Sequence, residues 1–585
     1  MGPNVKVGIV NMGFAVSSMR NVTLKEWRYI LSLGCVMLLT LFRYEAYWSD
    51  SESQMAWCIT LLGMMAIVVT VLQKQSVRWS SVDMLVALYS LYLFVNSIFV
   101  SHYPLAHQLL MIGQCVVLYV FVRIITANGR NVPQAMIWFM AIAGVYESVV
   151  GMMQLVGLKD TYTDTLHITG TFYNSGPLGI YIAVMLSVCT RYYLRTRENI
   201  MGLAIIVMLM GLSATWSRTA WLAYSIVLVL LFRSFFIRYR RIVLLLVVGI
   251  IAALYFIKQE SADSRTLMNI VAFKEWASHP WWGNGLGGYV HALAHGQIDF
   301  FRIHPDSAYV ACVGATNLAF NEYLKVMVEQ GLVGLVFMLS ILGFSLFRLY
   351  RKRSPLVYAM LALCFAALFS YPFHLYPFML LITMFVAIAA NSETYEVNTG
   401  IGKKVMMSVC LMITLCLSFL MNCEVDRRVE ISNDAKRIAF MHDVAFIDDY
   451  YELLPWMNDN RDYLFHFGKI LREAGRYNDS NAILRMETEL DTDPMAYVVM
   501  GRNYEDMNLY AEADSFYLQA FLLQPNRIYP LYRQMKLYER TGDVVRKDRK
   551  AREILAFTPK VMSPAVKEMK DEARKIVLCK KRMKS

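Results

Sequence analysis

The sequence predicts an all-α protein: a polytopic membrane helix bundle followed by a smaller domain of α-helical repeats. Hydrophobic residues make up 57% of the 585 residues and charged residues only 17%, whereas soluble domains hold about 25% charged residues. Charges are sparse and clustered up to about residue 422 and dense beyond it. The first part carries repeated apolar runs of membrane-crossing length, and the second part carries a sequence period of about 34 residues.

Thirteen apolar runs predict membrane spans, because about 20 mostly apolar residues cross the roughly 30 Å of hydrocarbon in a bilayer. No cleavable signal sequence precedes the first run, so we expect this run to remain as an anchor. The expected organisation is a cytoplasmic N-terminal segment at 1–26 and a membrane domain at 27–422 with about 12–13 transmembrane helices. The expected spans lie near 27–43, 55–73, 82–100, 105–123, 133–157, 176–194, 200–216, 218–236, 242–258, 323–347, 355–371, 374–391 and 405–422.

Lys and Arg residues cluster in alternate loops between these spans. This bias is typical of the cytoplasmic side of a membrane. It predicts that the N-terminus is inside and that the tail, after an odd number of crossings, lies outside the cytoplasm. One loop on the side with few cations is far longer than the others, at about 259–322, and it holds several tryptophans and histidines. Long loops in compact proteins are functional or disordered, and the many aromatic residues favour function.

The tail divides into an expected linker at 423–444 and a domain at 445–585. Three similar segments surround Tyr477, Tyr510 and Val544, which are 33 and 34 residues apart. That period resembles tetratricopeptide repeats, whose stacked helix pairs offer a concave surface to a protein partner. The alternative is an ordinary helical bundle with a chance period.

Composition and cysteine spacing exclude several classes of site. The net charge of +12 resides in short loops between apolar runs, so we expect contact with membrane lipids and no nucleic-acid partner. The ten cysteines are scattered, with no C-x-x-C pair or zinc spacing. We therefore expect no metal site, no disulfide framework and no cofactor.

Two arginines are the strongest candidates for chemistry. Arg218, in SATWSRTAWLA, lies at the expected outer end of two spans, where the positive-inside bias does not account for a cation. Arg265 lies at the start of the long outer loop. A guanidinium fork grips two phosphate oxygens at once and stays charged at any working pH. The alternative for Arg218 is a snorkelling side chain at a helix end.

The outer loops offer further candidates for substrate binding. Trp282 precedes a glycine-rich turn with Gly283, Gly285 and Gly287, where a backbone without side chains exposes N–H groups to anions; such turns also simply close loops. Asn174, in HITGTFYNSGPLGIYIA, leads into the sixth span, and its alternative role is that of a helix cap.

The segment FNEYLKVMVEQGLVGLVFML places Asn321 and Glu322 at the outer mouth of a span, with Glu329 two turns deeper on the same face. These acids either act in chemistry or favour the helix start, where the dipole attracts negative charge. His304, in the long loop, is a further candidate, whereas His374 in a proline-flanked turn is expected to be structural.

Taken in order, these segments resemble the O-antigen ligase / O-antigen polymerase superfamily of polytopic glycosyltransferases. The resemblance covers roughly residues 165–390 and is carried by TGTFYNSGPLGIYIA, SATWSRTAWLA, DSRTLMNIV, HPWWGNGLGGY and FNEYLKVMVEQGLVGLVFML. It implies a metal-independent transfer, on the periplasmic face, of a glycan carried by undecaprenyl diphosphate. The implied acceptor is lipid A–core in ligases, another glycan in polymerases, or a protein side chain in oligosaccharyltransferases.

By this resemblance Arg218 and Arg265 occupy the places of the arginines that hold the diphosphate. One departure stands out, because many members have His-Asn at the head of the last segment and that histidine is their proposed base. Here Phe320 takes its place, and a phenyl ring accepts no proton. Glu322, His304 and Asp306 are the remaining candidates for a base.

A different function class remains open, that of a transporter for lipid-linked sugars. Such proteins show internal repeats and polar residues near the middle of the membrane. The spans show no clear repeat, and the strongest polar candidates lie at the outer edge. The sequence therefore favours an enzyme.

Overall fold

The computed structural model describes residues 24–41, 49–72, 80–128, 131–162, 166–239, 241, 259–391, 401–559 and 561–582. The expected all-α class is confirmed, because these residues form helices and no strand. Twelve of the thirteen expected spans coincide with a helix, and the ninth, at 242–258, lies outside the described residues. The membrane helices are α2 (Leu24–Leu39), α3 (Asp50–Leu72), α4 (Ser81–Phe99), α5 (Ala106–Asn128), α6 (Val132–Leu155), α7 (Ser175–Thr196), α8 (Asn199–Ala214), α9 (Arg218–Leu231), α14 (Glu322–Arg351), α15 (Leu356–Ala366), α16 (Tyr376–Ala390) and α17 (Ile401–Met441).

Five of these helices, α4, α5, α6, α7 and α14, are individually long and apolar enough to cross a bilayer. Four others, α8, α9, α15 and α16, are apolar but have only 11 to 16 residues. At 1.5 Å per residue such helices fall short of a 30 Å span by themselves. The chain is a multi-pass membrane protein, and the count of thirteen crossings stays a prediction.

Helix α7 lies at the centre of the bundle. It packs against α6, α8, α9 and α15, and the residues from Pro177 to Thr190 are all buried. A helix that is apolar on every face is stable only when neighbours surround it, which fits the sequence of α7. Its N-terminal turn is thereby fixed at one end of the bundle.

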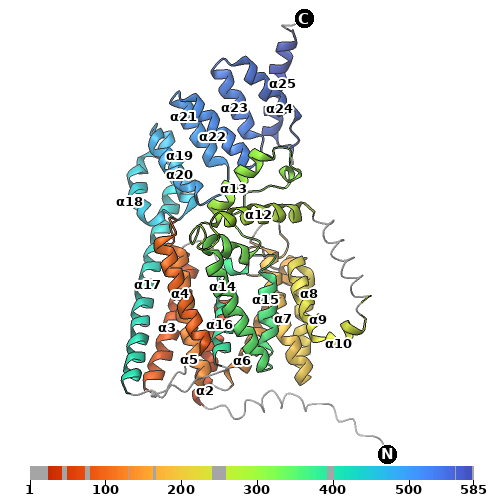
Figure 1. Ribbon diagram of the computed structural model, residues 1–585, viewed down its shortest axis with the longest axis vertical. Coiled ribbons are helices and arrows are strands. Elements are labelled where there is room, and N and C mark those ends of the chain that lie inside the picture. Colours follow the sequence, from red (N-terminus) through yellow and green to blue (C-terminus); the bar gives the residue numbers. More distant parts are fainter. Residues whose placement is uncertain are drawn as a thin grey trace, which may run out of the picture.

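Helix α17 connects the bundle to the C-terminal domain without a break. Its 41 residues extend about 60 Å, alongside α3 and onward past the end of the bundle (Figure 1). Hydrogen bonds from Ser53 and Trp57 of α3 reach Asp426. The expected linker at 423–444 is therefore helical as far as Met441.

The C-terminal domain is a row of helix pairs. Successive helices pack side by side from α18 to α25, with turns at Gly475, Asn508 and Gly542 that all have positive φ. These turns are 33 and 34 residues apart, which agrees with the period seen in the sequence; the tetratricopeptide assignment stays a prediction. The helices are α18 (Ile447–Met457), α19 (Arg461–Glu473), α20 (Tyr477–Thr488), α21 (Met495–Asp506), α22 (Tyr510–Leu523), α23 (Tyr529–Arg540), α24 (Val544–Ala556) and α25 (Pro564–Arg582).

The long loop lies between the bundle and the C-terminal domain (Figure 1). Its helix α12 (Gln259–Ser278) lies across the end of the bundle, and α13 (Tyr289–Ile303) packs against both α12 and α22. A short 3-10 helix, η1 (Ala308–Ala311), follows, and a second one, η2 (Pro372–His374), joins α15 to α16.

A kink in α14 receives the turn that connects α12 to α13. Gly331 interrupts the helix with φ 64° and ψ −166°, and the amide of Leu332 donates to the carbonyl of Pro280 at 2.8 Å. The amide of Asn284 donates to the carbonyl of Val328 at 2.7 Å. The backbone amide and carbonyl groups that lose their helical partners at the kink therefore form hydrogen bonds with the loop.

This packing predicts that Gly331→Ala destabilises the protein. A Cβ at this position would overlap with the carbonyl of Trp281, and the positive φ is unfavourable for alanine. We expect a loss of about 2 kcal/mol or more in the free energy of unfolding, measured by thermal denaturation in detergent. Gly343→Ala, in the same helix with open space around its Cβ position, is the matched control and should be neutral; equal effects of the two substitutions would contradict the account.

Candidate functional site

Arg218 is the first residue of α9 and lies where α9 meets the start of α7. The Ser217 side chain caps α9 by accepting a hydrogen bond from the amide of Ala220, and its hydroxyl donates to the carbonyl of Gly176 at 3.4 Å. Gly179 of α7 allows this close approach, because a Cβ there would lie 2.7 Å from the Cβ of Ser217. The half-buried Arg218 is thus fixed at the same end of the bundle as the N-terminus of α7.

Two buried polar side chains of α6 hold the segment that precedes α7. The carboxylate of Glu147 accepts hydrogen bonds from the amide and the hydroxyl of Thr171, at 3.1 and 2.6 Å. The amide oxygen of Gln154 accepts from the backbone of Thr169 and Gly170, at 2.9 and 2.7 Å. Asn174 then caps α7 through the amide of Gly176 at 2.9 Å and is exposed.

Arg265 projects from α12 onto an aromatic surface. Its guanidinium carbon lies 4.4 Å from the centre of the Phe320 ring, and its Nη1 donates to the carbonyl of Phe369 at 3.1 Å. Phe320 in turn packs edge-on against Tyr371, with ring centres 5.3 Å apart. The ring that replaces the expected histidine therefore supports an arginine.

The two arginines are electrostatic neighbours. Burial lowers the pKa of Arg265, and the positive charge of Arg218 lowers it further. Within the described part of the chain Arg265 has no carboxylate partner, and its Nε is buried without a hydrogen-bond acceptor. Both guanidinium groups stay charged at any working pH, and an anion that binds between them would reduce their mutual repulsion. The pair is suited to a dianion such as a diphosphate.

The start of α14 lies beside this pair. Asn321 caps the helix by accepting from the amide of Leu324 at 3.1 Å. Glu322 is buried, and its carboxylate accepts from the amide of His374 at 3.1 Å. Burial, together with the charges of Lys325 and His107, lowers the pKa of His374 to about 3, so its imidazole is neutral at physiological pH.

The other predicted site residues contact parts of the chain other than the two arginines. His304 ends α13 at an exposed position, where its ring contacts Phe300. Trp282 is 57% exposed and stacks on Tyr92 of α4. The glycines of the turn have positive φ, and Cβ atoms at Gly283, Gly285 and Gly287 would meet α14, Ser101 and Leu105. Their close approach is therefore to the protein's own backbone and side chains, which matches the loop-closing alternative.

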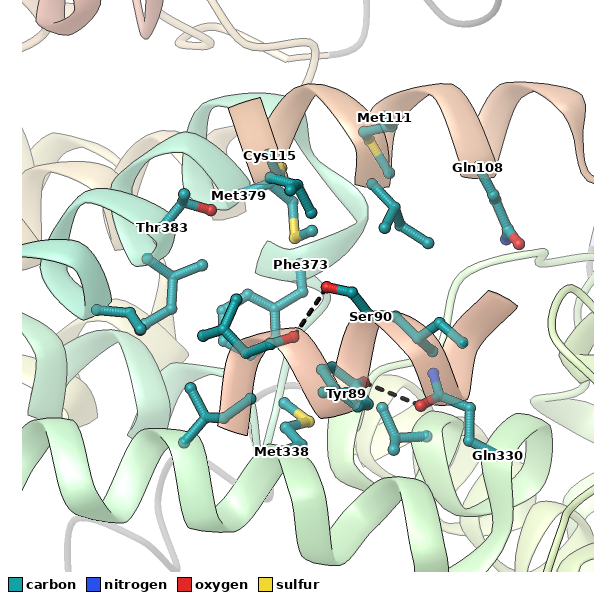
Figure 2. A pocket seen from close by; sticks show the side chains of 18 of the residues that line it. Tyr89, Ser90, Gln108, Met111, Cys115, Gln330, Met338, Phe373, Met379 and Thr383 are labelled. Atoms are coloured by element: carbon teal, nitrogen blue, oxygen red, sulfur yellow. Dashed lines mark hydrogen bonds between the residues drawn. The ribbon is translucent and has the colours of Figure 1, made fainter. Parts of the chain in front are cut away.

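A cavity of ≈ 270 Å³ lies among α4, α5, α14 and α16, next to Glu322. Its wall is mostly apolar, and Figure 2 shows Gln108 and Gln330 together at one end of it. The hydroxyl of Tyr89 donates to the side chain of Gln330 at 2.9 Å. The volume is close to the lower limit of ligand pockets, so the cavity has room for a segment of an apolar chain with a polar group at its end.

Residues 203–339 match the family described as O-antigen ligase. The matched region includes Arg218, α12 with Arg265, the glycine-rich turn and the first half of α14. No curated protein matches the chain at a significant level. The fold and this match define a multi-pass membrane protein with a glycan ligase or polymerase type of function.

The sequence alone did not identify the side chains that fix the segment before α7, or the residues that hold the guanidinium group of Arg265. Glu147 and Gln154 carry the detectable signal, because polar side chains within an apolar span usually have a partner or a function. The contact of Arg265 with Phe320 and Phe369 joins residues more than 50 positions apart, and no local pattern reports such a contact.

The ring beneath Arg265 leads to a binding prediction. Phe320→Leu removes the cation–π contact and loosens the guanidinium, so the affinity of the purified full-length protein for inorganic pyrophosphate should fall by roughly three- to tenfold. Phe320→Tyr keeps a ring and should bind like the original protein. Isothermal titration calorimetry makes the comparison, and an unchanged affinity for Phe320→Leu would show that the ring does not position Arg265.

Proposed function

We propose that the protein is a membrane glycosyltransferase of the O-antigen ligase type. It moves a glycan from an undecaprenyl-diphosphate carrier to an acceptor, such as lipid A–core, on the periplasmic face of the inner membrane. The observation that carries the proposal is the electrostatic proximity of Arg218 and Arg265, within the region that matches the ligase family.

The chemical argument concerns the leaving group. When the bond between the glycan carbon and the phosphate oxygen breaks, the electron pair stays on the diphosphate, and negative charge develops there. Preorganised cations at that position stabilise the transition state more than the ground state. Arg265 is held from two sides by Phe320 and Phe369, so little reorganisation is needed when the charge appears.

The acceptor hydroxyl needs a group that takes its proton, and we propose Glu322 for this role. It is two positions from Phe320, whose ring contacts Arg265, and it lines the cavity among α4, α5, α14 and α16. The exposed position of His304 at the end of α13 makes it a weaker candidate. No metal ion is part of the proposed mechanism, since two guanidinium groups supply the charge that the diphosphate requires.

The lipid carrier and the topology complete the proposal. The apolar cavity accommodates a segment of the polyprenyl chain, the rest of which lies among membrane lipids. The long loop and the C-terminal domain share one end of the bundle (Figure 1), and Arg265 belongs to α12 of that loop. We assign this end to the periplasm because the cation-rich loops are expected on the other side.

Closely related reactions are the alternatives. A polysaccharide polymerase and a protein O-oligosaccharyltransferase would use the same donor and the same arginines. Deletion of the gene separates them: a ligase loses long glycan from lipid A–core, a polymerase leaves a single capped repeat unit, and a protein transferase loses sugar from proteins alone. A transporter of lipid-linked glycans is the less favoured alternative.

Substitution of the arginines tests the proposal. In a strain that lacks the native copy, Arg218→Ala and Arg265→Ala should each reduce glycan transfer by about 100-fold or more, with normal membrane insertion. Arg195→Ala is the matched control, because this exposed residue lies at the opposite end of α7. Full transfer by both variants would remove the basis of the proposal.

A further inference from the structure

The C-terminal domain packs against the long loop and the start of α14. Leu522 and Leu523 of α22 belong to the same buried cluster as residues of α12, α13 and the start of α14. The side chain of Gln297, 2% exposed, donates to the carbonyl of Leu523 at 2.6 Å. Buried apolar contact with satisfied polar groups is typical of a permanent interface.

A segment without regular structure, residues 313–319, connects this interface to the arginine pair. A stretch of this kind has no helical hydrogen bonds of its own, so its conformation depends on contacts with its surroundings. It follows η1 and leads directly to Phe320 and the cap residue Asn321.

The C-terminal domain supplies those contacts at two points. The side chain of Asn526 donates to the carbonyl of Val313 at 2.6 Å. Asn317 donates to the carboxylate of Asp491 at 3.1 Å, and its own carbonyl oxygen accepts from the amide and the hydroxyl of Thr492, both at 3.2 Å. Donor and acceptor atoms of the Asn317 amide are therefore both used.

Asp491 and Thr492, which bind Asn317, are themselves held by other residues of the C-terminal domain. Asp491 lies 3.3 Å from the guanidinium of Arg461, and Thr492 is 1% exposed, with its carbonyl accepting from Gln524 at 3.2 Å. The attachment of residue 317 to the domain is therefore rigid. Phe320, whose ring supports Arg265, is only three positions beyond Asn317 in the sequence.

We infer that Asn317, clamped by Asp491 and Thr492, is a positioning residue through which the C-terminal domain holds Phe320 and Arg265 in place. The inference rests on the proposed function only for its effect on transfer. It gives the C-terminal domain a part in the reaction, and it means that any outside protein partner docks on surfaces other than the one that α13 covers.

Hydrogen–deuterium exchange on the full-length protein tests the clamp without reference to activity. Asn317→Ala should speed exchange within 313–319 by about tenfold at the hydrogen-bonded amides of Val313 and Leu318, because a side chain that held the segment is lost. Exchange should also rise at 321–325, where the amide of Leu324 reports whether Asn321 still caps α14. Exchange within α7 should stay unchanged. Asn478→Ala, an exposed residue of α20, is the matched control.

A double substitution that exchanges the amide and the carboxylate between positions 317 and 491 tests whether the contact can be restored. Asn317→Asp alone places two carboxylates side by side and should loosen the segment. Combining Asn317→Asp with Asp491→Asn restores one donor facing one acceptor and should recover most of the protection, which a general loss of stability would not do. Glycan transfer should fall roughly tenfold in Asn317→Ala and recover in the exchanged pair.

The outcomes separate the two proposals. Unchanged exchange at 313–325 in Asn317→Ala overturns the clamp. Faster exchange with full transfer overturns the positioning role and leaves the proposed function intact. If the original protein transfers no glycan, the proposed function fails, while exchange at 321–325 and its rescue still decide whether the C-terminal domain positions the start of α14.

Discussion

Two guanidinium groups of like charge lie within electrostatic reach of each other at one end of the bundle, and the surrounding structure holds them there. Arg218 depends on the close approach of α7 and α9 at Gly179, and Arg265 depends on Phe320 and Phe369. The supports come from separate parts of the chain. The repulsion between the arginines is an unfavourable term that folding must offset, and an anion converts it into binding free energy.

The polar groups within the bundle serve the same geometry. Glu147 and Gln154 fix the turn before α7, and the kink at Gly331 receives the turn that leads to α13. Buried polar groups with satisfied hydrogen bonds define one arrangement and exclude others. The C-terminal domain adds to these constraints, because α22 packs against the long loop and Asp491 binds Asn317.

The sequence predicted the class, the positions of the membrane helices and the helical tail, because the relevant signals are local: apolar runs, cap residues and a repeat period. It identified Arg218 and Arg265 as cations at the outer ends of apolar spans. The resemblance then assigned both of them to the same diphosphate. It could not show that Gly283, Gly285 and Gly287 pack on the protein itself, or that Phe320 supports Arg265, since both depend on contacts between distant segments. The structure also continues α17 into the expected linker as far as Met441.

The most direct measurement is an electron cryomicroscopy structure of the full-length protein in nanodiscs with farnesyl diphosphate. The account predicts density for the diphosphate between the side chains of Arg218 and Arg265, with the apolar chain directed toward the cavity among α4, α5, α14 and α16. A diphosphate bound elsewhere, or arginine side chains too far apart to share it, would contradict the central claim.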